Sequence, residues 1–266
     1  GFDILEFQAQ PLLEMTNEHM DEMKKAAADL GIELTYSLGL DPYYDISSRD
    51  EATRLRGVEY LKNIVERVGY MGGKVISGVS YQGWGCTDVD PVEGKKPLLE
   101  NSLKSMRELV KVAADNDITY CVEAVNRFEG CLINTAQEAL DYVNAVNSPN
   151  IGILLDTYHM NIEESSFSEA IHLAGDKLVN FHTGDNNRRC PGRGHIDFDE
   201  IFKALGDIHY TGRIVSEPFI ATGGEVGNAV ALWRDLEPDM SPEYRDKEAA
   251  YLLQYEKEKL AKYGLA

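Results

Sequence analysis

The sequence predicts a (β/α)8 barrel, because its apolar runs and the polar residues that end them recur at a regular spacing. Seven short apolar runs alternate with amphipathic segments of helical length along the whole chain. Parallel strands that are buried on both faces show such nearly continuous apolar runs. Each of the last four runs closes on a carboxylate or imidazole residue. Barrel enzymes place their chemistry at the carboxyl ends of the strands, so this pattern favours a closed barrel over an open, doubly wound sheet.

The predicted strands coincide with the apolar runs. They cover residues 2–7, 32–38, 74–79, 119–125, 151–157, 178–183 and 213–218. A closed barrel of this type needs eight strands. The chain opens with Gly1 almost inside the first run. We therefore expect that the first strand–helix unit of the barrel is absent from this sequence.

Amphipathic helices are predicted between the strands. They cover residues 17–30, 50–68, 98–116, 136–146, 167–174 and 198–205, and a long charged helix covers 242–263. Thr135, followed by Glu138, has the pattern of a capping box before one helix. Gly31 and Gly206 follow predicted helix ends, where a left-handed residue is common. No internal repeat, low-complexity tract or linker divides the pattern, so residues 1–266 are expected to form a single domain.

The composition argues against several classes of partner. The chain has 26 Lys and Arg residues against 45 Asp and Glu residues, a formal net charge of −19. This excess of acid argues against nucleic acid, because affinity for phosphates comes largely from Lys and Arg. No apolar run approaches the roughly 18 residues of a membrane span. The four cysteines, at 86, 121, 131 and 190, are scattered and are expected to be free thiols in a reducing cytoplasm.

Four candidate ligands end the last four strands: Glu123, Asp156, His182 and Glu217. They are separated by 33, 26 and 35 residues, close to the roughly 30 residues of one strand–helix unit. Taken singly, each would be an ordinary residue at the rim of the barrel. Together they would aim one polar group each at the same rim, and three carboxylates with one imidazole suit a hard or borderline divalent cation.

Such a site suits chemistry next to a carbonyl group. A divalent ion held mostly by carboxylates stabilises a developing enediolate, and Glu123 and Glu217 could move protons on either face of a chelated carbon. This points to isomerisation or epimerisation of a hydroxy-ketone. Metal-assisted hydrolysis would use similar ligands, so ligand type alone leaves the reaction open.

Further polar residues follow the same strands at short offsets. Glu129, His159 and Arg188 are expected to form the pocket above the metal. Arg127 and Arg189 lie in the same loops, where they either join this pocket or balance surface charge. Two other signals are weak: GWG at 83–85 could present an aromatic wall to a sugar or form a turn, and PGRG at 191–194 matches no phosphate-binding motif.

Five segments of the chain form a recognisable set: VEAVNRFE at 122–129, LDTYHMNIEE at 155–164, FHTGDNNR at 181–188, PGRG at 191–194 and SEPF at 216–219. They resemble the ketose 3-epimerases, the D-tagatose 3-epimerase and D-psicose (D-allulose) 3-epimerase group of the xylose isomerase-like barrels. The similarity runs over essentially the whole chain, and the segments occur in the family's order. The resemblance implies a TIM barrel with Mn²⁺, or with Co²⁺ or Mg²⁺ as substitutes.

The resemblance also implies roles for the individual residues. The four candidate ligands match the family's metal ligands. Glu123 and Glu217 match its acid/base pair, of which one removes the C3 proton of a ketohexose and the other returns it to the opposite face through a cis-enediolate. Glu129, His159 and Arg188 match the residues that hold the O1 and O2 end of the substrate. Gly78 and Trp84 match residues that line the pocket. The family's first strand, with an aromatic residue that faces the substrate, has no counterpart here.

The expected substrates are free ketoses: D-fructose giving D-psicose first, D-tagatose giving D-sorbose next, and L-ribulose giving L-xylulose. The resemblance also implies a homodimer or a homotetramer. Two alternatives remain open. One is an aldose–ketose isomerase of the same superfamily (hydroxypyruvate isomerase-like). The other is a DNA-repair enzyme of the endonuclease IV type, which would need more metal-ligating His and Asp residues and a basic face. A non-catalytic sugar-binding module would not need both Glu123 and Glu217.

Overall fold

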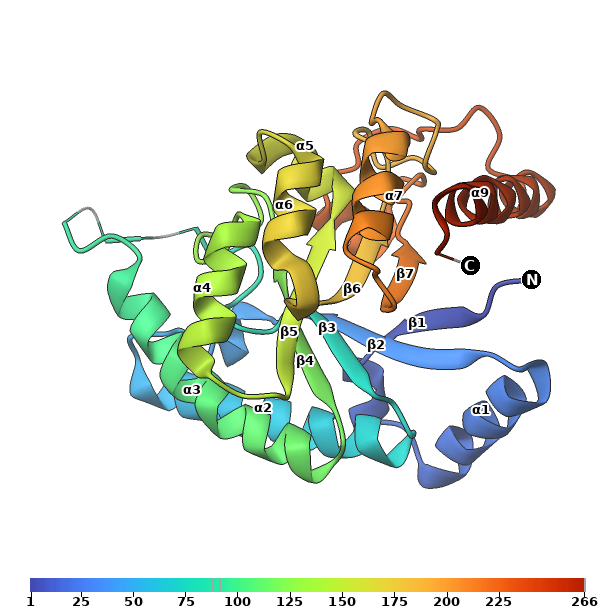
Figure 1. The fold of residues 1–266 in the computed structure, drawn as a ribbon. Helices are drawn as coiled ribbons and strands as arrows, with labels where there is room; N and C mark the ends of the chain where they lie inside the picture. Colours follow the sequence, from blue (N-terminus) through green and yellow to red (C-terminus); the bar gives the residue numbers. More distant parts are fainter. Residues whose placement is uncertain (88, 91, 266) are drawn as a thin grey trace.

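The structure, a computed structural model, describes residues 1–87, 89–90 and 92–265. Its centre is a sheet of seven parallel strands in sequential order, each hydrogen-bonded to the next (Figure 1). The strands are β1 (Ile4–Gln8), β2 (Glu33–Gly39), β3 (Val75–Val79), β4 (Thr119–Ala124), β5 (Ile151–Asp156), β6 (Leu178–Thr183) and β7 (Arg213–Ser216). The predicted barrel architecture is confirmed, with seven parallel strands in the described residues.

Helices connect successive strands and cover the outside of the sheet (Figure 1). They are α1 (Asn17–Leu30), α2 (Glu51–Tyr70), α3 (Lys96–Asp115), α4 (Ala136–Val146), α5 (Thr157–Glu163), α6 (Phe167–Ala174), α7 (Phe198–Asp207), α8 (Gly224–Ala229) and α9 (Pro242–Tyr263). Thr16, Thr135 and Ser241 each accept a hydrogen bond from the backbone N–H three residues later. These caps satisfy donors that a helix cannot satisfy within its own first turn.

Several element ends differ from the prediction, and α5 and α8 were not predicted. β7 stops at Ser216, before the predicted end at 218. β5 stops at Asp156, because Thr157 already begins α5, whose first N–H groups donate to the Asp156 carboxylate. α5 has only seven residues and α8 only six, too few for a helical period to be recognised in the sequence.

The two predicted helix-end glycines have different roles. Gly31 has the expected left-handed backbone, with φ of 67°, and ends α1. The prediction for Gly206 is wrong, because α7 continues to Asp207 and Gly206 lies inside it. A Cβ at Gly206 would lie 2.7 Å from the carbonyl oxygen of Tyr263, at the end of α9. This glycine therefore allows two helices to approach closely.

The barrel is nearly closed, since its two edge strands β1 and β7 lie near each other. Glu256 of α9 supports the β7 side: its carboxylate accepts hydrogen bonds from Thr183 of β6 and Ser216 of β7, at 2.5 and 2.7 Å. A cavity of about 540 Å³ is lined by residues of β1, β7 and α9. The carboxyl ends of β6 and β7 are thus held together directly beside His182 and Glu217.

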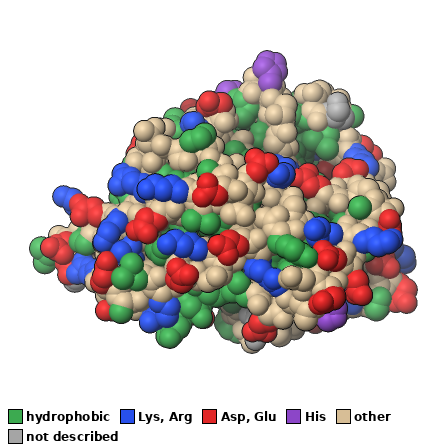
Figure 2. All heavy atoms as spheres, turned by 90° about the horizontal axis from the view of Figure 1, so that it is seen from below, with side chains coloured by type: hydrophobic (Ala, Val, Ile, Leu, Met, Phe, Trp, Pro, Cys, Tyr) green, Lys and Arg blue, Asp and Glu red, His purple; other side chains and the backbone are tan. Residues whose placement is uncertain are grey.

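Three expectations from the composition concern the surface charge, membrane spans and the cysteines. Figure 2 shows basic and acidic side chains interspersed over the face that it draws. None of the described helices has the length and apolar character that crossing a membrane requires. Cys121 and Cys190 are buried and free. Val75, Cys121 and Leu154 pack together as a small apolar cluster, separate from the large core.

Candidate active site and metal centre

A pocket of about 330 Å³ opens at the carboxyl ends of the strands. Its lining includes most of the predicted site residues, namely Gly78, Trp84, Glu123, Glu129, His159, His182, Arg188 and Glu217. Gly78 has φ of 102°, and a Cβ there would lie 2.4 Å from the carbonyl oxygen of Leu38. Only glycine is compatible with both features of this wall.

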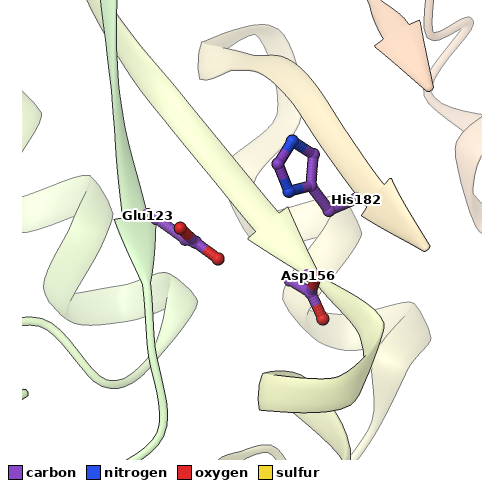
Figure 3. Close-up of side chains that lie close together, drawn as sticks. All are labelled: Glu123, Asp156 and His182. Atoms are coloured by element: carbon purple, nitrogen blue, oxygen red, sulfur yellow. The ribbon is translucent and has the colours of Figure 1, made fainter. Parts of the chain in front are cut away.

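Three of the four candidate ligands form a tight, buried cluster. Figure 3 shows Glu123, Asp156 and His182 around one space, on the neighbouring strands β4, β5 and β6. Each offers one ligand atom, and these atoms all lie within 4.8 Å of one another. Asp156 Oδ2 and His182 Nδ1 are buried and have no hydrogen-bond partner. Buried polar atoms are rarely left unsatisfied, so these orphaned atoms and the donor set suggest a metal site.

Glu217 lies at the border of this cluster. It follows the end of β7, where its backbone N–H donates to the carbonyl oxygen of Thr183 at 2.9 Å. Its Oε2 is 3.7 Å from His182 Nδ1 and 4.0 Å from Arg188 Nη1. About a third of the side chain is exposed to the pocket. Its carboxylate therefore faces the orphaned nitrogen of His182 from the open side.

Burial and mutual repulsion shift the ionisation of the cluster. Burial raises the pKa of Glu123 well above its usual range, and the carboxylates of Glu217 and Asp156 raise it further. Burial also raises the pKa of Asp156 to about 6, against the opposing effect of the Arg188 guanidinium. For His182, burial disfavours the charged ring, but Glu6 and Glu217 outweigh it and the pKa is raised well above normal. Without a cation, the cluster therefore tends to retain protons.

The Asp156 shift predicts how the stability of the metal-free protein depends on pH. The unfolded carboxyl group titrates near 3.8 and the folded one near 6, so between these values the native state binds the extra proton. The free energy of unfolding should therefore fall as pH rises through this window, by up to about 3 kcal/mol for this group. Denaturant unfolding from pH 4 to pH 7 tests this against Asp156→Asn, which should lack this component. Identical slopes for both proteins would contradict it.

Glu6 is a functional candidate that the sequence analysis missed. It lies on β1, and its Oε1 is 2.8 Å from His182 Nε2. Only 7% of its side chain is exposed. A charged residue in the middle of an apolar strand was the signal that could have identified it, because a buried carboxylate needs a partner. Histidines that bind metals usually donate their other ring N–H to such a group.

His159 presents a neutral imidazole to the pocket. Its Nδ1 accepts hydrogen bonds from the backbone and side-chain N–H groups of Asn126, at 3.2 and 2.8 Å. The ring proton is thereby assigned to Nε2, which lies 3.5 Å from Glu123 Oε1. Burial, together with Arg188 and His182, lowers the pKa of His159 well below normal. His159 is therefore a hydrogen-bond donor at neutral pH without carrying charge.

Glu129 joins the other polar groups of the pocket. Its Oε1 accepts hydrogen bonds from Arg188 and Asn126, at 3.1 and 2.9 Å, and its Oε2 accepts one from the Trp84 indole at 3.2 Å. Trp84 thus lines the pocket and does not merely form a turn. Of these partners, Asn126 was not predicted, although it lies within the same loop motif.

Arg188 alone of the three candidate arginines faces the pocket. Its guanidinium stacks over the ring of Tyr158 at 3.7 Å and lies 5.1 Å from the centre of the Phe219 ring. Arg127 forms an ion pair with Glu163, and Arg189 forms one with Glu237. Neither residue lines the pocket.

The PGRG loop at 191–194 holds the segment that carries Arg188 in place through hydrogen bonds and an ion pair. The carboxylate of Asp185 accepts hydrogen bonds from the N–H groups of Gly194 and Ile196. Arg193 pairs with Glu248 of α9. The N–H groups of Gly194 and Ile196 are therefore already satisfied, and this loop is a support for Arg188.

Comparisons with known proteins find relatives over most of the chain. The sequence model of the family described as "Xylose isomerase-like TIM barrel" matches residues 1–247. The chain is 40% identical to the D-psicose 3-epimerase of Ruminiclostridium cellulolyticum, over 96% of this chain and 87% of that protein. It is 36% identical to the ketose 3-epimerase of Arthrobacter globiformis, over 90% and 79%.

A solved structure extends the similarity to the fold. It is the D-psicose 3-epimerase from Clostridium cellulolyticum H10, crystallised with D-tagatose. The TM-score is 0.94 at 40% sequence identity, covering 98% of this chain and 90% of that one. The chain therefore belongs to the ketose 3-epimerase family of isomerases, within the xylose isomerase-like TIM barrels.

Proposed function

We propose that this protein epimerises C3 of free ketohexoses, D-fructose to D-psicose first and D-tagatose to D-sorbose next. The observation that carries the proposal is the buried cluster of Glu123, Asp156 and His182, with its orphaned ligand atoms, beside a pocket of about 330 Å³ that Glu123 and His182 line. The relatives named above support the substrate class, because their names describe epimerases of D-psicose and of ketoses.

The proposed metal is Mn²⁺, with Co²⁺ or Mg²⁺ as substitutes. Glu123, Asp156, His182 and Glu217 would hold it, because their carboxylates and imidazole are ligands that divalent cations of this type accept. When bound, the cation would neutralise the negative charge that develops on the substrate oxygens during proton transfer.

Glu123 and Glu217 are the proposed acid/base pair. Their strands β4 and β7 are separated in the sheet by β5 and β6, so the two carboxyl groups approach the pocket from different sides. One would remove the C3 proton to give a cis-enediolate, and the other would return a proton to the opposite face.

The proposed contacts of the substrate are made by a neutral imidazole, a guanidinium group and a carboxylate. His159 would donate its Nε2–H, and Arg188 and Glu129 would hold the O1 and O2 end, beside Trp84 and Gly78. Among the described residues that line the pocket, Arg188 is the only Lys or Arg, and it already pairs with Glu129. This supports a free sugar over a sugar phosphate, which would bring two negative charges into an acidic site.

Products from a panel of ketoses test the proposal. Mn²⁺-loaded protein should convert D-fructose, D-tagatose and L-ribulose into D-psicose, D-sorbose and L-xylulose, as read by chromatography. Aldose products would instead indicate an aldose–ketose isomerase. Absence of conversion for every ketose, in protein that binds Mn²⁺, would contradict the proposed activity.

Replacing Arg188 by Lys should impair substrate positioning. Lysine keeps the charge but loses the planar group that stacks over Tyr158. We expect KM to rise about tenfold, at least as much as kcat falls, because the stacked cation is worth roughly 1–2 kcal/mol. Steady-state kinetics with D-fructose measure both constants. Arg127→Lys is the matched control, since Arg127 is exposed and paired with Glu163, and it should change neither constant.

A further inference from the structure

Glu6 occupies a position inside the barrel from which it can orient His182. β1 and β6 are not neighbours in the sheet, so the contact between Glu6 Oε1 and His182 Nε2 crosses the barrel interior. Nδ1 of the same ring is the buried atom without a hydrogen-bond partner. One nitrogen of His182 is therefore held by a carboxylate, and the other faces the metal cluster.

We propose that Glu6 is a positioning residue for metal binding. It holds the His182 ring with its proton on Nε2, which leaves the lone pair of Nδ1 available to the cation. The inference rests on the proposed metal site and adds a residue outside the four predicted ligands. It follows from the direction of each hydrogen bond around the Glu6 carboxylate.

The second oxygen of Glu6 can only accept hydrogen bonds from its neighbours. Thr35 Oγ1 donates to Glu6 Oε2 at 3.1 Å, and Asn180 Nδ2 donates to it at 3.3 Å. The Asn180 amide is itself fixed, because its Oδ1 accepts from the N–H of Phe181 at 3.1 Å, and its Nδ2 also donates to Ser77 Oγ at 2.7 Å. Asn180 Nδ2 also lies 3.4 Å from His182 Nε2, but its two hydrogens are already donated to Glu6 Oε2 and Ser77 Oγ. Oε1 of Glu6 therefore remains for His182, and Nε2 must be the donor.

An amide at position 6 would reverse this assignment. In Glu6→Gln, the oxygen of the amide is needed by Thr35 and Asn180, so its NH2 group faces His182. His182 Nε2 would then have to accept, and the ring proton would move to Nδ1, the atom that must bind the metal. The same logic explains why an Asp→Asn change that imposes the wrong tautomer cripples a Ser–His–Asp triad.

The first test is the affinity for Mn²⁺, measured on metal-free protein by competition with a chelating indicator. Glu6→Gln should bind Mn²⁺ about 10- to 100-fold more weakly than the wild type, as for other second partners of metal-bound histidines. Circular dichroism should show that the metal-free variant keeps the wild-type fold, so that the weaker binding is measured on folded protein. Glu33→Gln is the matched control: Glu33 begins β2, is partly exposed and pairs with Arg213, and its affinity should stay unchanged.

The second test detects the ring proton itself. Protein labelled with ¹⁵N-histidine and loaded with diamagnetic Mg²⁺ should show a slowly exchanging Nε2–H signal for His182, and Glu6→Gln should lose it. Equal Mn²⁺ affinity of variant and wild type, or a wild-type His182 without a proton on Nε2, would overturn the role of Glu6. A wild type that binds no divalent cation would instead overturn the proposed metal site.

Discussion

Glu217→Gln should lower kcat for D-fructose epimerisation by several orders of magnitude. The amide can neither remove nor return a proton, and general acid/base catalysis contributes about 10²- to 10⁴-fold by itself. Glu217 Oε2 also faces His182 Nδ1 at 3.7 Å, so the change removes negative charge from the proposed metal site as well. Because both effects act on the chemical step, kcat and kcat/KM should fall together.

The Glu217 prediction requires a control for folding and for general charge. Glu258→Gln makes the same substitution on the exposed face of α9, where Glu258 accepts a hydrogen bond from Gln254, and its kinetics should match the wild type. Glu123→Gln should reproduce the loss seen for Glu217→Gln. Circular dichroism should show the same fold for all three variants. A Glu217→Gln enzyme with a near-normal rate would remove this residue from the mechanism.

Removal of divalent cations should abolish activity, and Mn²⁺ should restore it. Activity should be lost because the cation would neutralise the negative charge that develops on the substrate oxygens. The cation should bind again because Asp156 Oδ2 and His182 Nδ1 are otherwise buried without partners, which is costly. Rebinding should also stabilise the fold by about 2.7 kcal/mol at a free concentration one hundred times the Kd. Dialysis against a chelator, elemental analysis and kinetics with added Mn²⁺, Co²⁺ or Mg²⁺ measure these effects.

A variant of the cluster provides a control for cation removal. Asp156→Asn should lose most of the stabilisation by Mn²⁺, because it replaces a charged ligand with a neutral one. Full turnover by protein that elemental analysis shows to be free of divalent cations would contradict the metal site. Such a result would leave the fold and the pocket unaffected.

Much of the site could be predicted from the sequence because of one property of parallel strands. Buried strands read as continuous apolar runs, and their carboxyl ends meet at one rim. Glu123, Asp156 and His182 end β4, β5 and β6, so strand positions alone were enough to bring them together. Errors of one or two residues at the strand ends did not matter, since the ligand atoms of these side chains still lie within 4.8 Å of one another.

The missed features depend on contacts between distant segments. Glu6 and His182 are 176 positions apart, and only the closure of the barrel brings β1 against the residues of β6. The stacking of Arg188 on Tyr158 joins the loop after β6 to α5 in the same way. Gly206 was misread because its close neighbour, Tyr263, lies on another helix. Local patterns predict elements, whereas such pairs appear only after the elements are packed.

The position of proton exchange tests the central claim most directly. Mn²⁺-loaded protein incubated with D-fructose in D₂O should introduce deuterium at C3 of both the recovered substrate and the D-psicose formed, as read by NMR. The reason is that Glu123 and Glu217 would exchange protons with solvent on opposite faces of C3. No deuterium bound to carbon should appear at C1. Deuterium at C1, or an aldose product, would contradict epimerisation and indicate an aldose–ketose isomerase on the same barrel.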